Sequence, residues 1–146
     1  MHLPRYTLKT SPKMTYFEFI SKGPKGDILK IVEFQETNLK DFYNLAFGDK
    51  DIVSGEISDT TVSNNGDTEM VLAIVVSALY EFTIRNPDVW VYASGSSKTR
   101  TRLYRMGINK FLDEILSDFY LFGELGEDWV EFEKSIDFSG FIVKRK

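Results

Sequence analysis

The segment from Thr68 to Asn86 constrains the fold most, because apolar residues surround almost the whole of the helix that it predicts. Asn64–Asp67 supplies a turn before it, Asp67 or Thr68 can cap its start, and Pro87 forbids its continuation. A helix that is apolar on nearly every side is a buried one. Other elements of the chain must therefore enclose it.

Strand patterns precede this helix. Thr15–Ser21 and Ile28–Phe34 are rich in aromatic and β-branched residues, and the turn residues Gly23–Asp27 lie between them, which predicts a β-hairpin. Asp41–Asp49 is predicted to be the next antiparallel strand, with a bulge near Asn44 where its apolar alternation shifts phase. Lys50–Asn65 is polar and predicts a long surface loop.

Strand and helix patterns alternate after the central helix. Val89–Ser94 predicts a strand, a cationic helix follows and reaches Leu116 with a kink or break at Gly107, and Asp118–Gly123 predicts another strand. Glu124–Asp137 has helical spacing in Trp129, Phe132 and Ile136, and Phe141–Lys144 can add a last strand. We therefore expect an α+β fold in residues 1–146, a single domain with a mixed, mostly antiparallel sheet, a buried central helix and a second, basic helix.

Composition excludes several kinds of site. The chain has no cysteine, so disulfides, thiolate zinc sites and cysteine nucleophiles are excluded, and its one histidine is His2, near the N-terminus. We expect neither a serine–histidine–acid triad nor a metal site. The N-terminus lacks a secretory pattern and no apolar run is long enough for a bilayer, which predicts a cytoplasmic protein without membrane contact.

The loop and helix that follow Val89–Ser94 are the best candidate for a ligand site. A helix start offers backbone N–H groups and a positive dipole end, and cationic side chains follow it closely. We expect an anion site for a phosphate-bearing small molecule, such as a nucleotide or coenzyme. Its residues are Ser96, Ser97, Lys98, Arg100, Arg102 and Arg105. Asn65 and Gly66, before the central helix, are either a turn with a cap or a second ligand-facing loop.

Two other interpretations of the basic helix stay open. Lys98, Arg102 and Arg105 share one helical face, which could be a solvated face that pairs with the acidic segment Glu124–Asp137. The same patch could instead contact RNA or an acidic protein, as in a toxin-like or regulatory protein. The net charge of −4 argues against a general polyanion binder, so such contact would be local. Cofactor identity and oligomeric state stay open.

Three parts of the chain together carry a resemblance. They are Gly23–Gly26, the pair Tyr43–Asp49 and Asn64–Asp67, and Gly95–Ser97 with Arg100–Arg105. These parts resemble an uncharacterised bacterial family found mainly in Bacteroidota. That resemblance implies a single cytoplasmic domain and no particular chemistry.

The order of elements also resembles that of the GCN5-related N-acetyltransferases. This resemblance implies an acetyl-CoA pyrophosphate at Val62–Asp67, although that segment has one glycine and lacks the family's leading Arg or Gln. Arg102–Ile108 resembles the family's later helix, which implies Tyr104 as the general acid for a departing thiolate. Glu33 or Asp49 would then accept the amine proton. A degenerate or active acyltransferase is therefore a further alternative.

Overall fold

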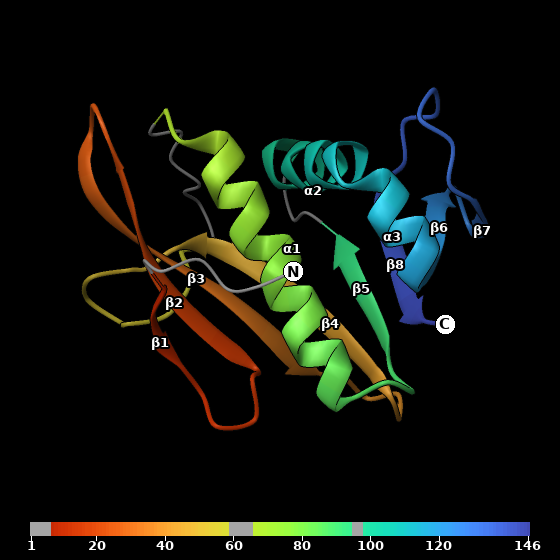
Figure 1. Cartoon of the computed structure of the whole chain (residues 1–146), viewed down its shortest axis with the longest axis horizontal. Helices are drawn as coiled ribbons and strands as arrows, with labels where there is room; N and C mark the ends of the chain where they lie inside the picture. The colour runs from red at the N-terminus through yellow and green to blue at the C-terminus, as the bar shows by residue number, and fades with distance from the viewer. Residues whose placement is uncertain (1–6, 59–65, 95–97) are drawn as a thin grey trace.

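The computed structural model describes residues 7–58, 66–94 and 98–146, which form an α+β fold (Figure 1). The described strands make one mixed sheet in the order β1-β2-β3-β4-β5-β8-β6-β7. All described strand pairs are antiparallel except β4 with β5. This confirms the predicted fold class. No helix in the described part of the chain combines the length and apolar character that crossing a bilayer requires.

The first half of the sheet is an antiparallel meander. Its strands are β1 (Thr7–Thr10), β2 (Tyr16–Gly23), β3 (Gly26–Glu36) and β4 (Phe42–Asp49). Gly23 pairs with Gly26 across the predicted hairpin turn, and Gly26 takes a φ of 87°, which glycine adopts without strain.

The predicted bulge near Asn44 is wrong. The β3–β4 register runs without a shift from Lys30 opposite Asp49 to Glu36 opposite Tyr43. The apolar alternation shifts because Phe42 lies on the other face of the sheet, where its ring centroid is 6.2 Å from that of Tyr92. Aromatic residues on both faces therefore produced the apparent phase change.

The central helix α1 (Thr68–Arg85) connects β4 to its parallel neighbour β5 (Trp90–Ser94). It is buried along most of its length, as its sequence predicts. The Phe82 ring stacks on Phe34 of β3 at 4.3 Å between centroids, and Tyr80 meets the Phe119 ring edge-on at 5.2 Å. Helix α1 is therefore held against both halves of the sheet.

The C-terminal half differs from its prediction in two places. Helix α2 (Lys98–Lys110) continues through Gly107, which packs against Leu72 of α1, and the break before α3 (Leu112–Asp118) falls at Phe111. Part of Glu124–Asp137, where the spacing of Trp129, Phe132 and Ile136 is helical, is a strand, β7 (Asp128–Glu131). It forms a hairpin with β6 (Phe119–Leu125) through a turn in which Gly126 has a φ of 64°.

The last strand, β8 (Gly140–Arg145), lies between β5 and β6. Because side chains alternate along a strand, the sheet has two distinct faces. We call the face that packs on the helices the helical face, and the opposite one the open face. The helical face includes Phe34, Leu45, Val91 and Val143, and the open face includes one continuous cross-sheet row of Gln35, Asn44, Tyr92, Ile142 and Phe122.

Candidate functional site

Strands β4 and β5 part in the middle of the sheet. Their parallel pairing covers Phe42–Asn44 with Trp90–Tyr92, and the described residues of β4 beyond Asn44 have no pairing with β5. Helix α2 lies beyond the end of β5, above this opening (Figure 1). Ligands of open α/β sheets bind where strands end and a helix begins, so this opening is a candidate ligand site.

An apolar cavity lies on the helical face beside the opening. Its volume is about 60 Å³, and its walls come from the sheet and all three helices. Leu45 and Ala93 line it from the two parted strands, and Val75 and Leu103 line it from α1 and α2. Since an apolar cavity of roughly 150 Å³ holds a benzene ring, this smaller one has room for a short aliphatic or thioester-sized group.

A polar cleft lies on the other side of the same opening. Its volume is about 400 Å³, within the usual range for small-molecule sites. Glu33, Gln35 and Asn44 line it from the open face of β3 and β4. Asn44 Nδ2 donates to Gln35 Oε1 at 3.2 Å, and Gln35 Nε2 donates to Glu33 Oε1 at 2.9 Å. This chain of amides orients the Glu33 carboxylate.

Tyr104, for which the resemblance noted above implies the role of general acid, lies between the apolar cavity and the polar cleft. Its side chain is 6% exposed and lines both the cavity and the cleft, as do Leu45 and Phe47. Burial raises the pKa of Tyr104 above its ordinary value, while the Arg100 guanidinium and a hydrogen bond with the Phe47 backbone lower it in part. The phenol therefore stays protonated at neutral pH and can donate a proton or a hydrogen bond.

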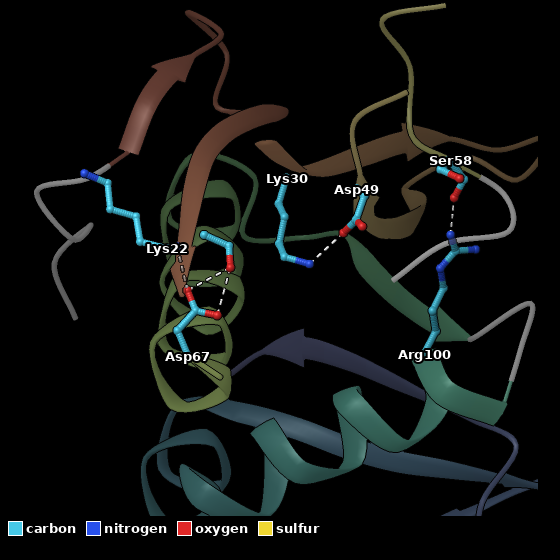
Figure 2. Close-up of polar contacts among 7 residues, drawn as sticks. Lys22, Lys30, Asp49, Ser58, Asp67 and Arg100 are labelled. Atoms are coloured by element: carbon cyan, nitrogen blue, oxygen red, sulfur yellow. Dashed lines mark hydrogen bonds and ion pairs between the residues drawn. The ribbon is translucent and has the colours of Figure 1, made fainter. Parts of the chain in front are cut away.

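Arg100 also lines the cleft. Its guanidinium is buried and donates to the Ser58 carbonyl, which ties α2 to the segment after β4 (Figure 2). Gly48 makes room for this contact, because a Cβ there would lie 3.0 Å from Arg100 Nη2 and 2.8 Å from Ile57 Cγ2. Arg100 thus contributes to the shape of the cleft as well as its charge.

The other predicted cations point in different directions. Lys98 and Arg102 are exposed on α2. Arg105 Nη1 donates to Asp137 Oδ1 at 2.9 Å, so part of the basic helix pairs with the acidic segment as one sequence interpretation expected. The structure therefore divides the predicted cluster into a buried arginine, a paired arginine and two exposed cations.

Of the remaining predicted ligand residues, the structure describes one. Ser96, Ser97 and Asn65 are outside the described residues. Gly66 lies two residues before Thr68, the first residue of α1, and has a φ of 80°. Asp67 occupies the cap position without a capping hydrogen bond.

The Asp67 carboxylate instead holds strand β2. It accepts from Ser21 Oγ at 2.8 Å and from the Lys22 backbone N–H at 3.2 Å (Figure 2). This contact ties the start of α1 to the β2–β3 hairpin, and it turns the aspartate toward the protein's own donors.

The two acids proposed as proton acceptors differ in environment. Asp49 Oδ1 lies 2.6 Å from Lys30 Nζ, and both side chains are buried on the helical face (Figure 2). Glu33 lies in the polar cleft, which Tyr104 also lines. The structure thus brings Glu33 and Tyr104 to one space and places Asp49 in a buried ion pair.

Sequence reasoning missed the polar residues that accompany Glu33. Gln35, Asn44 and Glu56 line the cleft, yet each reads in the sequence as an ordinary strand or loop residue. The one available signal is alternation, since residues 33 and 35 of a strand point to the same face. Their partners on β4 become evident only from the strand register.

Comparisons with known proteins identify a family but no activity. The model of DUF6934, described as a family of unknown function, matches residues 2–146. Neither the curated proteins nor the solved structures gave a match to this chain.

Proposed function

The chain belongs to the DUF6934 family, whose function is unknown, and we propose that it binds a phosphate-bearing coenzyme at the opening between β4 and β5. Coenzyme A or one of its thioesters is the class that we infer. The observation that carries this proposal is the joining of a polar cleft to an apolar cavity by Tyr104 where the strands part. A ligand that fits both spaces has a polar part and a slender, less polar arm.

The opening favours an extended arm over a bulky ring. Beyond Asn44 the edge of β4 faces the gap, and strand edges carry backbone donors and acceptors. An arm built from amides could add its own hydrogen bonds along such an edge. The about 60 Å³ cavity would then receive only the end of the arm. These features support a pantetheine-like arm.

Phosphates of the same ligand would lie at the first turns of α2. Lys98 and Arg102 are one helical turn apart and both are exposed. Phosphate oxygens accept charge-assisted hydrogen bonds from such side chains, and a helix start favours negative charge. The order of strands and helices, which resembles that of GCN5-related N-acetyltransferases, also supports a coenzyme at this place.

Acyl transfer is a second candidate function, favoured by the presence of Glu33 and Tyr104 in one cleft. An amine would attack the thioester carbonyl, so that a C–N bond forms and the C–S bond breaks. Glu33 would take the proton that the amine loses, and Tyr104 would protonate the departing thiolate. Glu33→Gln and Tyr104→Phe should then each lower the rate of thiol release at least tenfold while coenzyme A still binds. If release is unchanged in both, acyl transfer by these residues is wrong.

Calorimetric titration of the full chain with coenzyme A tests the binding proposal. Arg102→Ala should weaken binding about tenfold, since a hydrogen bond to a charged group contributes roughly 1.5–3 kcal/mol. Arg105→Ala is the matched control, because it removes the same charge from the same helix but breaks a contact to Asp137. We expect it to change affinity less than twofold.

Two outcomes would overturn the binding proposal. One is the absence of both a heat signal and a thermal shift with coenzyme A at millimolar concentration. The other is preferential binding of short RNA with a steep loss of affinity as salt rises, which is the behaviour of a contact with several phosphates.

A further inference from the structure

The open face of the sheet carries a band of aromatic side chains over its C-terminal half. The rings of Phe42 and Tyr92 lie 6.2 Å apart between centroids, those of Tyr92 and Trp129 lie 5.6 Å apart, and those of Trp90 and Phe122 lie 6.1 Å apart. Strand pairing places these rings on the face away from the three helices. We call these five residues the aromatic band.

The band is accessible to solvent. Trp129 is 40% exposed, and the other four side chains are half-buried. An antiparallel sheet with one solvated face normally carries polar side chains on that face. Contiguous apolar side chains on an otherwise solvated surface mark interaction sites. The band therefore has the character of a binding surface.

Two carboxylates lie beside the band. Glu124 lies opposite Trp129 and Glu131 lies opposite Phe122, so both acids are on the open face. Tyr92 Oη donates to Glu124 Oε1 at 2.8 Å, and Gly140 leaves room for that pair, because a Cβ there would lie 2.9 Å from the Tyr92 ring. Glu33 continues the acidic surface across the polar cleft.

The chain itself shows that this surface accepts a cation. Lys144 Nζ lies 5.8 Å from the centroid of the Trp90 ring, which is the distance of a cation–π contact. Among the described residues of β5, β6, β7 and β8, Lys144 is the one basic residue on the open face, against Glu124 and Glu131. Lys146, which follows β8, lies over the Tyr120 ring of β6, but its Nζ donates to the Leu116 carbonyl of α3. Aromatic rings with a surplus of carboxylates match a partner that carries lysine or arginine.

We propose that the aromatic band binds an extended, lysine- or arginine-bearing segment of a partner protein. A cationic group of that segment lies over Trp129, as Lys144 lies over Trp90, and the N–H groups of the segment donate to Glu124 and Glu131. Such contacts are individually weak at an exposed site, so together they give a weak and reversible complex. This inference does not rest on coenzyme binding, because the band lies outside the apolar cavity and the first turns of α2.

Tryptophan fluorescence tests this inference directly, because both tryptophans of the chain, Trp90 and Trp129, belong to the band. The full chain is titrated without coenzyme A. One probe is a peptide that alternates lysine and arginine with glycine and serine, and the other is a peptide of equal length with glutamate at the basic positions. The basic peptide should give a saturable change that weakens as salt rises, and the acidic peptide should give none.

Variants separate the band from the rest of the surface. Trp129→Ala should weaken binding of the basic peptide at least fivefold, as read from Trp90. Glu124→Gln should weaken binding about threefold and make it less sensitive to salt, because the variant loses a negative charge. The amide keeps an acceptor for Tyr92, so this local contact is retained. Leu116→Ala is the control, because this exposed side chain belongs to α3 on the helical side. It should leave binding unchanged.

Three results would overturn the inference. They are equal responses to the basic and acidic peptides, unchanged affinity in both band variants, and a dilution-dependent tryptophan spectrum that sedimentation assigns to a dimer. In the last case a second copy of this chain covers the band.

Discussion

The stability of the fold should be sensitive to a single substitution in the ion pair between Lys30 and Asp49. Lys30 is 1% exposed, its Nζ lies 2.6 Å from Asp49 Oδ1, and the ammonium also lies 5.7 Å from the centroid of the Phe47 ring. Removal of one partner from a buried pair leaves the other charge without its compensation. We predict that Lys30→Met lowers the free energy of unfolding by about 3–5 kcal/mol in urea titrations.

The double variant Lys30→Met with Asp49→Leu is the control for this prediction. It replaces both charges with apolar groups of similar size, and such replacements are often neutral or stabilising. It should therefore recover most of the stability that Lys30→Met loses. A Lys30→Met protein as stable as the parent would contradict the buried pair.

Tyr16 gives the protein a pH dependence in the alkaline range. Burial, together with the hydrogen bond that Tyr16 Oη donates to Glu18 Oε2 at 2.9 Å, raises its pKa to about 12. The unfolded chain loses this proton near pH ~10. Between these values the folded state binds more protons than the unfolded one, so stability falls as pH rises. Below about pH 10 the contribution of Tyr16 is fully present.

Urea unfolding at several pH values between about 9 and 12 checks this sign. Tyr16→Phe should make the decline shallower, because the variant has no proton to hold at this position. Tyr120→Phe is the control, since Tyr120 is 52% exposed on β6 and should leave the slope unchanged. A slope that is the same in the parent and in Tyr16→Phe would contradict the assignment.

At the scale of elements, Gly123 fixes how the segment after β7 packs. A Cβ at Gly123 would lie 2.4 Å from ring atoms of Phe138, a buried residue that also packs against the Phe132 and Phe141 rings. The ring cannot move away without opening this cluster. We predict that Gly123→Ala lowers the free energy of unfolding by about 1–3 kcal/mol, as overpacked cores do.

The pair Gly123→Ala with Phe138→Leu separates steric conflict from a simple backbone effect. The smaller leucine leaves space for the new methyl group, so the double variant should be more stable than the sum of the two single losses implies. Additive losses, measured by urea unfolding of all four proteins, would show that the ring contact is not the cause.

Elements with a strong apolar periodicity were predictable from sequence. Elements with a weak or ambiguous periodicity were not. The apolar helix α1 and the strands β2, β3 and β5 follow their patterns. Strand β1 is a four-residue edge strand with polar residues, so its sequence carries little signal. The sequence does not indicate strand β7, because Trp129 has helical spacing with Phe132 and Ile136, although β7 ends at Glu131.

The candidate site was predictable only in part, since its residues come from segments far apart in sequence. Tyr104 and Glu33 were named from the resemblance to acetyltransferases, and the structure brings them to one cleft. The inward turn of Arg100 was not predictable, because its acceptor Ser58 lies 42 residues away. Spacing along a helix gives the direction of a side chain but not its tertiary partner.

At the scale of the whole molecule, the sheet separates two surfaces of different character. The helical face encloses the apolar cavity beneath α1 and α2, and the open face carries the polar cleft and the aromatic band. The parted strands β4 and β5 are the place where the two sides meet. We infer that a ligand arm passes through this opening while a cationic partner contacts the open face.

Methyl NMR of the full chain tests the central claim, the seating of a coenzyme arm between β4 and β5, most directly. Coenzyme A should shift the methyl signals of Leu45, Val75 and Val91, which line the cavity, and should leave Leu39, exposed in the β3–β4 turn, unchanged. Adenosine 3′,5′-bisphosphate has the phosphates without the arm and should shift none of the cavity signals. Equal shifts with both ligands, or coenzyme binding that leaves Leu45 and Val91 unchanged, would contradict the claim.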